Sequence, residues 1–259
     1  MSFLHTSHGK LFYAQRGTGT PTIVAVHGAG GTHQHWGLQL QALGETTHMI
    51  ALDLPGHGRS PGPGCRRIAD YSQILVAALD ALGLERAVLA GHSMGGAIAL
   101  WTALTVPERV AGLALIGTGA RLRVLPALIE GFVDDPAAAV RLIVERAYGS
   151  AAAPALRIAS EVAFRQTDPA VFRGDLLGCH VFDALEQVQA IRCPTLLLCG
   201  MEDQLTPPRF SQYLHEQIAG STLVLVPGAG HMVLIEQPEA VNATLREFFY
   251  RLTCQYRSD

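Results

Sequence analysis

The sequence predicts an α/β fold: a mostly parallel sheet flanked by helices, with a helical cap insertion. Short apolar runs rich in β-branched residues recur along the chain, and Gly, Pro or polar residues bound each of them. Stretches with helical spacing separate these runs, except in one region that is helical throughout. Strands that alternate with helices are typical of a parallel sheet covered by helices on both faces.

The expected strands begin with a hairpin, over residues 3–7 and 10–16, around His8-Gly9. The later strands are continuous apolar runs, which is the pattern of a strand buried on both faces. They cover residues 22–26, 49–52, 87–90, 110–116, 195–199 and 223–226. The helices between them are expected over residues 33–43, 67–83, 94–105, 208–219 and 236–252.

Residues 120–189 form the expected cap, and residues 1–119 and 190–259 form the core domain. The cap segment has helical periodicity but no convincing strand. The sequence Asp134-Asp135-Pro136 looks like a helix start, because proline is favoured in the first helical turn. Prolines divide the segment into three or four short helices, and they are Pro126, Pro136, Pro154 and Pro169.

Composition narrows the class of protein. A chain of 259 residues suits one large α/β domain. Its hydrophobic fraction of 49% excludes a disordered chain, and its net charge of −3 without a basic patch indicates no nucleic-acid partner. Five cysteines, an odd number without CxxC spacing, favour a reduced, cytoplasmic setting. The first ten residues show no pattern of a secretory signal.

One stretch, residues 87–107, contains no Asp, Glu, Lys or Arg. It is long enough to be scored as a membrane span, which needs roughly 20 mostly apolar residues. However, it contains Gly91-His92-Ser93-Met94-Gly95-Gly96, which does not suit a continuous span. The stretch instead divides into a short strand and a short helix, so we expect no membrane partner.

The same six residues match Gly-x-Ser-x-Gly between a strand and a helix. In that context the turn forces the serine into a strained conformation and presents its hydroxyl. Glycines are needed at positions 91 and 95, because a Cβ atom would clash across so tight a turn. Ser93 is therefore the predicted nucleophile, and the alternative is a glycine-rich turn with an incidental serine.

A serine hydroxyl is a poor nucleophile without a base. Asp203 and His231 each follow a buried apolar run, in loops where open α/β sheets build their sites. We expect His231 to take the proton from Ser93, and Asp203 to hold the imidazole and stabilise its cation. Glu202, beside Asp203, is the competing acid.

Hydrolysis also needs donors for the developing negative charge. The loop His27-Gly28-Ala29-Gly30-Gly31 follows the first buried strand and offers backbone N–H groups. We expect the N–H groups of Ala29 and Met94 to form the oxyanion hole. This loop matches neither the Walker phosphate motif nor the dinucleotide motif, and we expect no cofactor.

Other polar residues have simpler explanations. His33 and His35 form an H-x-H pair, but no third ligand follows by spacing, so we expect no metal. His92 is expected to point to the other side of the turn and to be structural. Asp53 is expected to tie down the turn-rich segment 53–60 through its carboxylate.

These motifs resemble those of the α/β-hydrolase superfamily, and they span nearly the whole chain in the family's order. The matching pieces are HGAGG at 27–31, DLPGHGRS at 53–60, GHSMGG at 91–96, the Asp203 loop and Gly230-His231. The resemblance implies an eight-stranded sheet with a helical cap at about 120–185. It also implies a triad and an oxyanion hole, which carry over onto Ser93, Asp203, His231, Ala29 and Met94.

The identity of the nucleophile reduces the number of branches of this superfamily that the chain can resemble. Haloalkane dehalogenases and epoxide hydrolases of this fold use Asp at the elbow, where this chain has Ser93. The motifs look most like those of small Ser-dependent carboxylesterases and enol-lactonases. C–C bond hydrolases and cofactor-free haloperoxidases share the triad and stay open, although haloperoxidases usually have an aromatic residue where Ala29 stands. The expected activity is hydrolysis of a small carboxylic ester through an acyl-enzyme, and an enol-lactonase is an alternative on the same triad. The alternative of another class is a ligand receptor with a vestigial triad.

The cap is expected to supply the substrate pocket. Its residues Leu125, Leu128, Ile129 and Phe132 either face the triad or form the core of the cap, and we favour the core. Trp36 either borders the pocket or anchors its helix. Six cap arginines are candidates for binding an acidic substrate: Arg121, Arg123, Arg141, Arg157, Arg165 and Arg173. The sequence does not indicate the oligomeric state.

Overall fold

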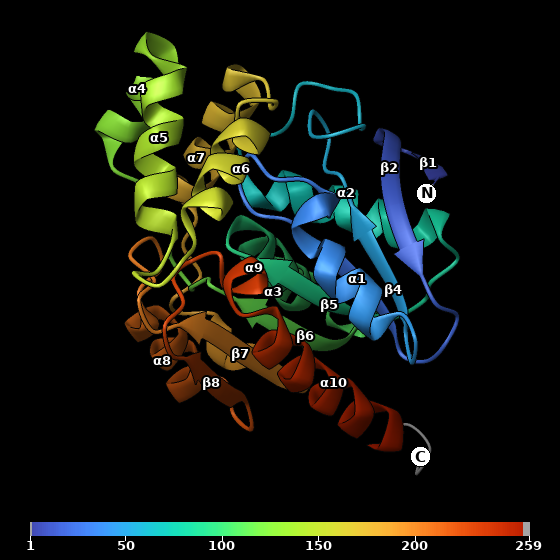
Figure 1. Ribbon diagram of the computed structural model, residues 1–259. Helices are drawn as coiled ribbons and strands as arrows, with labels where there is room; N and C mark the ends of the chain where they lie inside the picture. The colour runs from blue at the N-terminus through green and yellow to red at the C-terminus, as the bar shows by residue number, and fades with distance from the viewer. Residues whose placement is uncertain (1, 256–259) are drawn as a thin grey trace.

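An eight-stranded sheet forms the centre of the molecule (Figure 1). The structure is a computed structural model, and it describes residues 2–255. The strands lie in the order β1-β2-β4-β3-β5-β6-β7-β8, with antiparallel pairing from β1 to β4 and parallel pairing across the rest. Their bounds are β1 Ser2–Thr6, β2 Gly9–Arg16, β3 Thr22–Val26, β4 His48–Leu52, β5 Ala87–His92, β6 Val110–Ile116, β7 Thr195–Gly200 and β8 Thr222–Val226. The predicted fold class, an α/β-hydrolase fold with a mostly parallel sheet, is confirmed.

Helices cover both faces of the sheet. One face packs against α2 (Ile68–Ala81), α3 (Met94–Thr105) and α8 (Pro208–Gln217). The other packs against α1 (Gly37–Leu43), α9 (Val233–Glu236) and α10 (Pro238–Gln255). Every residue of β5, β6 and β7 is buried, which explains why these strands are continuous apolar runs.

One expected helix is divided in the structure, and another begins two residues later than expected. The segment expected over 33–43 begins as a short 3-10 helix, His33–Trp36, because the Thr32 hydroxyl accepts the Gln34 N–H and caps a tight first turn. The helix expected over 236–252 is α10, which begins at Pro238, and the short helix α9 precedes it. The break falls at Gln237, because Pro238 has no N–H to continue the hydrogen-bond ladder of α9.

Four α-helices lie between β6 and β7, and we call them the cap helices. They are α4 Pro126–Asp134, α5 Pro136–Ala147, α6 Pro154–Phe164 and α7 Pro169–Val181. Each begins with proline, and the side chains of Asp135 and Asp168 cap α5 and α7. The cap helices share a core of their own, built on residues such as Val140, Phe164 and Phe172, and they stand together at the upper left of Figure 1.

The stretch without charged residues, 87–107, divides between β5 and α3. Within residues 2–255, no helix combines the length and the apolar character that a membrane crossing requires. The apolar character has another cause, because β5 is central in the sheet and α3 is buried against it.

Candidate active site

Ser93 lies in the sharp turn between β5 and α3. Its backbone has φ 54° and ψ −118°, and it is the only residue other than glycine with positive φ in the described chain. This conformation is strained for a residue with a side chain. The turn closes because Gly91 and Gly95 have no Cβ, which would lie 2.2 Å from Gly95 O and from Val26 O respectively. The strained turn places Ser93 on the wall of a cavity.

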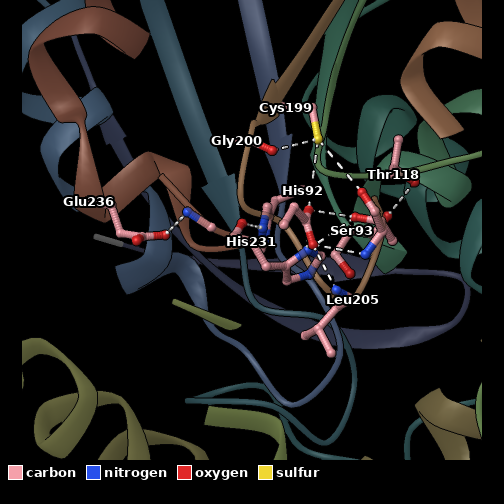
Figure 2. Close-up of polar contacts among 11 residues, drawn as sticks. His92, Ser93, Thr118, Cys199, Gly200, Leu205, His231 and Glu236 are labelled. Atoms are coloured by element: carbon pink, nitrogen blue, oxygen red, sulfur yellow. Dashed lines mark hydrogen bonds and ion pairs between the residues drawn. The ribbon is translucent and has the colours of Figure 1, made fainter. Parts of the chain in front are cut away.

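His231 lies beside this turn (Figure 2), and its ring contacts Asp203. Asp203 follows β7, His231 follows β8, and the distance from His231 Nδ1 to Asp203 Oδ2 is 2.8 Å. The backbone N–H groups of Leu205 and Thr206 both donate to Asp203 Oδ1 at 2.8 Å. The Thr206 hydroxyl donates to Oδ2, also at 2.8 Å.

These contacts fix the charge of Asp203. Burial alone would raise the pKa of Asp203, but the charge on protonated His231 and the hydrogen bonds from His231 and Thr206 lower it below its usual range. An ionised Asp203 accepts a hydrogen bond from the Nδ1–H of His231, so we assign the single ring proton of the neutral imidazole to Nδ1 from these partners. Nε2 is then unprotonated and can act as a base. No hydrogen bond joins Ser93 and His231 in the described structure, although both line the same cavity.

Two further residues hold the His231 loop. His92 Nε2 donates to the carbonyl oxygen of His231 at 2.8 Å, and the two rings lie 4.8 Å apart. The expectation that His92 points to the other side of the turn is therefore wrong, although the side chain is buried and structural. Burial and the neighbouring His231 lower the pKa of His92 to about 3, so the ring stays neutral. Glu236 accepts the N–H groups of Gly230 at 2.9 Å and of Gly149 at 2.7 Å.

Glu202, the competing acid, makes a different contact. Its carboxylate accepts the N–H of Ser150 at 2.6 Å, on the loop that follows α5. The structure therefore brings Asp203, and not Glu202, to His231. Sequence reasoning missed Thr206 and Glu236, because a hydroxyl or carboxylate that bonds to loop backbone leaves no spacing pattern in the chain.

The loop after β3 lies directly against Ser93. A Cβ atom on Gly28 would stand 3.1 Å from the Ser93 Cβ, and the loop closes through a 3.0 Å hydrogen bond from Gly31 N to Gly28 O. Ala29 lines the same cavity as Ser93. Met94 begins α3, so its N–H stands at the positive end of the helix dipole. Within the described residues, neither the Ala29 nor the Met94 N–H donates a hydrogen bond.

The cavity has a volume of about 210 Å³, and its far wall comes from the cap helices and the segment before them. Leu125 and Leu128 line it, whereas Ile129 and Phe132 are buried in the core of the cap. Leu128 also packs against that core, so the expectation that all four residues belong to it is wrong only for Leu125. Trp36 is fully buried under the sheet and anchors its helix.

Two arginines, Arg123 and Arg146, lie on the cavity wall, and no Asp or Glu among residues 2–255 lines it. Arg123 was among the candidates, but Arg146 was missed. Other cap arginines pair elsewhere: Arg121 with Asp183, Arg165 with Glu161 and Arg173 with Glu130. The cavity is therefore apolar with a positively charged edge.

The H-x-H pair divides between two roles. The Asp53 carboxylate accepts hydrogen bonds from the His33 backbone and ring, and from the Arg59 N–H, so it ties down its loop as expected. His35 lines the cavity, and its buried Nδ1 has no hydrogen-bond partner in the described structure. Burial and the nearby His231 lower the pKa of His35 to about 4. Among residues 2–255, no cluster of three His, Cys, Asp or Glu is placed to hold a metal ion.

A strained serine after the central strand of a mostly parallel eight-stranded sheet is the arrangement of the α/β hydrolases. The chain belongs to this family: the alpha/beta hydrolase family model matches residues 23–244. It is accordingly a hydrolase of this fold.

Several individual proteins are similar in sequence to this chain along nearly its whole length. A putative carbamate hydrolase, RutD, from Azorhizobium caulinodans is 30% identical over 96% of this chain and 98% of its own. A pimeloyl-[acyl-carrier protein] methyl ester esterase from Pectobacterium carotovorum is 29% identical over 89% of this chain and 94% of its own. The solved structure of a thermophilic esterase is 33% identical over 97% of both chains, with a TM-score of 0.87.

Proposed function

We propose that the protein is a serine hydrolase that cleaves small carboxylic esters through an acyl-enzyme. The observation that carries this proposal is the common cavity, which is lined by strained Ser93, by His231 bound to Asp203, and by Ala29. A nucleophile, an oriented base and oxyanion donors are the three parts that acyl transfer requires.

The proposed reaction has two halves. Ser93 Oγ attacks the ester carbonyl while His231 Nε2 accepts its proton, and the N–H groups of Ala29 and Met94 stabilise the oxyanion. His231 then gives this proton to the leaving alkoxide as the C–O bond breaks, which leaves an acyl-Ser93. Water attacks the acyl group, His231 accepts a proton from the water, and the carboxylic acid leaves as Ser93 regains its hydrogen.

The cavity supports a small substrate whose far end is negatively charged. Its volume of about 210 Å³ and its apolar wall suit a short acyl chain, and Arg123 and Arg146 offer cationic partners at the edge. An ester that also carries a carboxylate fits both features. Relatives named as a methyl ester esterase and a thermophilic esterase support ester cleavage.

A lactone that carries a carboxylate is the second candidate, because the same positive edge favours it. The reaction steps are the same, except that the leaving oxygen stays attached to the acyl group. The five cysteines support the cytoplasm as the proposed setting.

The test compares Ser93→Ala with Ser7→Ala, a matched change in the exposed turn between β1 and β2. With p-nitrophenyl acetate and butyrate, we expect Ser93→Ala to lose at least about 10³-fold in kcat and Ser7→Ala to match the wild type. Undiminished turnover by Ser93→Ala would overturn the proposal. Labelling of Ser93 by a fluorophosphonate, without turnover of any ester or lactone, would instead favour a receptor.

A further inference from the structure

Asp175, in cap helix α7, is a fully buried acid that the proposed mechanism does not use. Its carboxylate accepts three hydrogen bonds from three different segments of the core. Oδ2 accepts the backbone N–H of Gly30 at 2.9 Å and the His57 ring at 2.8 Å, and Oδ1 accepts the Tyr71 hydroxyl at 2.6 Å. A single cap side chain thus joins α2, the loop after β4 and the loop that carries Ala29.

The contact with His57 is an ion pair. His57 Nδ1 lies 3.0 Å from the carbonyl oxygen of Pro55, and Nε2 lies 2.8 Å from Asp175. Both partners are acceptors, so both ring nitrogens must carry protons and the ring is an imidazolium. Burial alone would lower the pKa of His57, but the charge and hydrogen bond of Asp175 raise it. Neighbouring His27 fits this assignment: its Nδ1 donates to Gly28 O at 2.8 Å and its Nε2 accepts the Leu54 N–H, so His27 is neutral.

Two other residues of the cap, in α7 or just before it, also contact Gly30. The Thr167 hydroxyl donates to the carbonyl oxygen of Gly30 at 2.9 Å. The Phe172 ring occupies the space where a Cβ of Gly30 would stand, at 2.2 Å from that position. Gly30 has φ 65°, so its backbone already favours glycine, and the cap packs against the bare Cα.

These contacts act on one peptide group of the oxyanion loop. The Gly30 N–H belongs to the peptide that joins Ala29 to Gly30, so its orientation restricts the rotation of Ala29 about its Cα–C bond. On the other side of Ala29, the loop is closed by the hydrogen bond from Gly31 to Gly28. Two contacts therefore restrict the direction of the Ala29 N–H. One is the hydrogen bond within the loop, and the other is the bond from the Gly30 N–H to the cap carboxylate of Asp175.

We propose that Asp175 is a positioning residue for the oxyanion hole: it holds the Ala29–Gly30 peptide so that the Ala29 N–H points at the developing oxyanion. The cap then helps to position the oxyanion hole, in addition to lining the substrate cavity. This inference rests on the proposed function, since an oxyanion hole matters only if acyl transfer occurs at Ser93.

The test uses Asp175→Asn, with Asp168→Asn as the matched control. Asp168 makes the N-cap of the same helix, is exposed, and can be replaced by Asn, which also caps helices. For Asp175→Asn we expect kcat to fall about 10- to 100-fold with KM within about 3-fold, because one oxyanion donor is misplaced rather than removed. Affinity for phenyl trifluoromethyl ketone, whose adduct with Ser93 carries an oxyanion, should fall by the same factor. Asp168→Asn should match the wild type in all three quantities.

A readout without substrate keeps this proposal separate from the proposed function. Hydrogen exchange of a peptide that spans residues 28–31 should be faster in Asp175→Asn than in the wild type or in Asp168→Asn. If Asp175→Asn does not fold, Thr167→Val replaces it, because that change removes only the bond to Gly30 O and should lower kcat and ketone affinity in parallel.

The outcomes are distinct. The positioning role is overturned if the wild type turns over ester while folded Asp175→Asn, or Thr167→Val, keeps the wild-type kcat, ketone affinity and hydrogen exchange. That result leaves the proposed function standing. Faster exchange with no turnover or ketone binding by the wild type shows that the contact is real, but overturns the proposed function and the positioning role with it. Parallel losses of kcat and ketone affinity, with faster exchange, support both.

Discussion

Nδ1 of His231 lies 2.8 Å from Oδ2 of Asp203, across 28 residues of chain. Two adjacent parallel strands, β7 and β8, bring the two loops together, because each loop begins where its strand ends. The neighbouring acid, Glu202, bonds to the cap-side loop through Ser150 instead. This difference makes the identity of the acid testable.

Asp203→Asn should lower kcat by about 10³- to 10⁴-fold, because an amide there cannot stabilise the protonated imidazole and favours the wrong tautomer. Glu202→Gln is the matched change one residue away and should keep activity within about 3-fold of the wild type. Steady-state kinetics with p-nitrophenyl butyrate measure both variants. A larger loss in Glu202→Gln than in Asp203→Asn would contradict the assignment.

The backbone strain at Ser93 predicts a stability difference between two inactive variants. A side chain at φ 54° and ψ −118° is unfavourable, whereas glycine adopts such angles without strain. Ser93→Gly should therefore be more stable than Ser93→Ala by about 1 kcal/mol, although glycine also gains entropy in the unfolded chain. Urea unfolding measures the difference, and equal or reversed stabilities would show that the turn is relaxed.

His35 predicts a loss of stability in acid. Burial, with the nearby His231, lowers its pKa from 6.5 to about 4, so the folded protein resists protonation of this ring. The stability linked to neutral His35 is present above pH 6.5 and is lost as the pH falls through about 4. Between pH 7 and pH 4.5, the unfolding free energy of the wild type should fall by about 2 kcal/mol more than that of His35→Gln.

The control for this measurement is His8→Gln, which changes an exposed histidine in the turn between β1 and β2. Its curve of unfolding free energy against pH should follow that of the wild type. If His35→Gln follows the same curve, the burial of a neutral His35 is not linked to acid stability.

Arg146 predicts a preference for anionic substrates. It lies on the cavity wall and has no ion-pair partner among residues 2–255. Arg146→Gln should lower kcat/KM for monomethyl adipate about 5-fold, as expected for one partly exposed charge pair, and should leave methyl hexanoate unaffected. Arg141→Gln, an exposed residue of the same helix that does not line the cavity, is the control. Equal effects on both esters would exclude a charge interaction.

Much of the core could be predicted from the sequence, because its signals are local. A strand, a glycine-bounded serine and a helix follow one another directly at Ser93, and Asp203 follows the buried strand β7. His231 follows β8, and the expectation that this strand is buried on both faces is wrong, because β8 lies at the edge of the sheet and is mostly only partly buried. The predicted positions of the central strands β5, β6 and β7 are correct because strands buried on both faces must be continuous apolar runs. The division of the first helix and the separate short helix α9 could not be predicted, because helical spacing does not report a change from 3-10 to α geometry or a short break before proline.

The cap could be predicted as helical but not in its contacts. Helical spacing shows which residues share a face, but it does not say whether that face meets the cavity or another helix, as Leu125 and Ile129 illustrate. Asp175 left a signal that could have been used: it falls on the apolar face of α7 between Val171 and Cys179, at spacings of four. A lone acid on a buried face requires partners, and here those partners come from the core.

The covalent intermediate at Ser93 is the most direct test of the whole account. The wild type is mixed with p-nitrophenyl butyrate, quenched in acid within the first turnover, and analysed by mass spectrometry of the intact protein and of its peptides. We expect one butyryl group per chain, located on Ser93 in the peptide that joins β5 to α3, and none on Ser93→Ala. Turnover of the ester with an unmodified Ser93, or with equal rates in Ser93→Ala, would contradict the account.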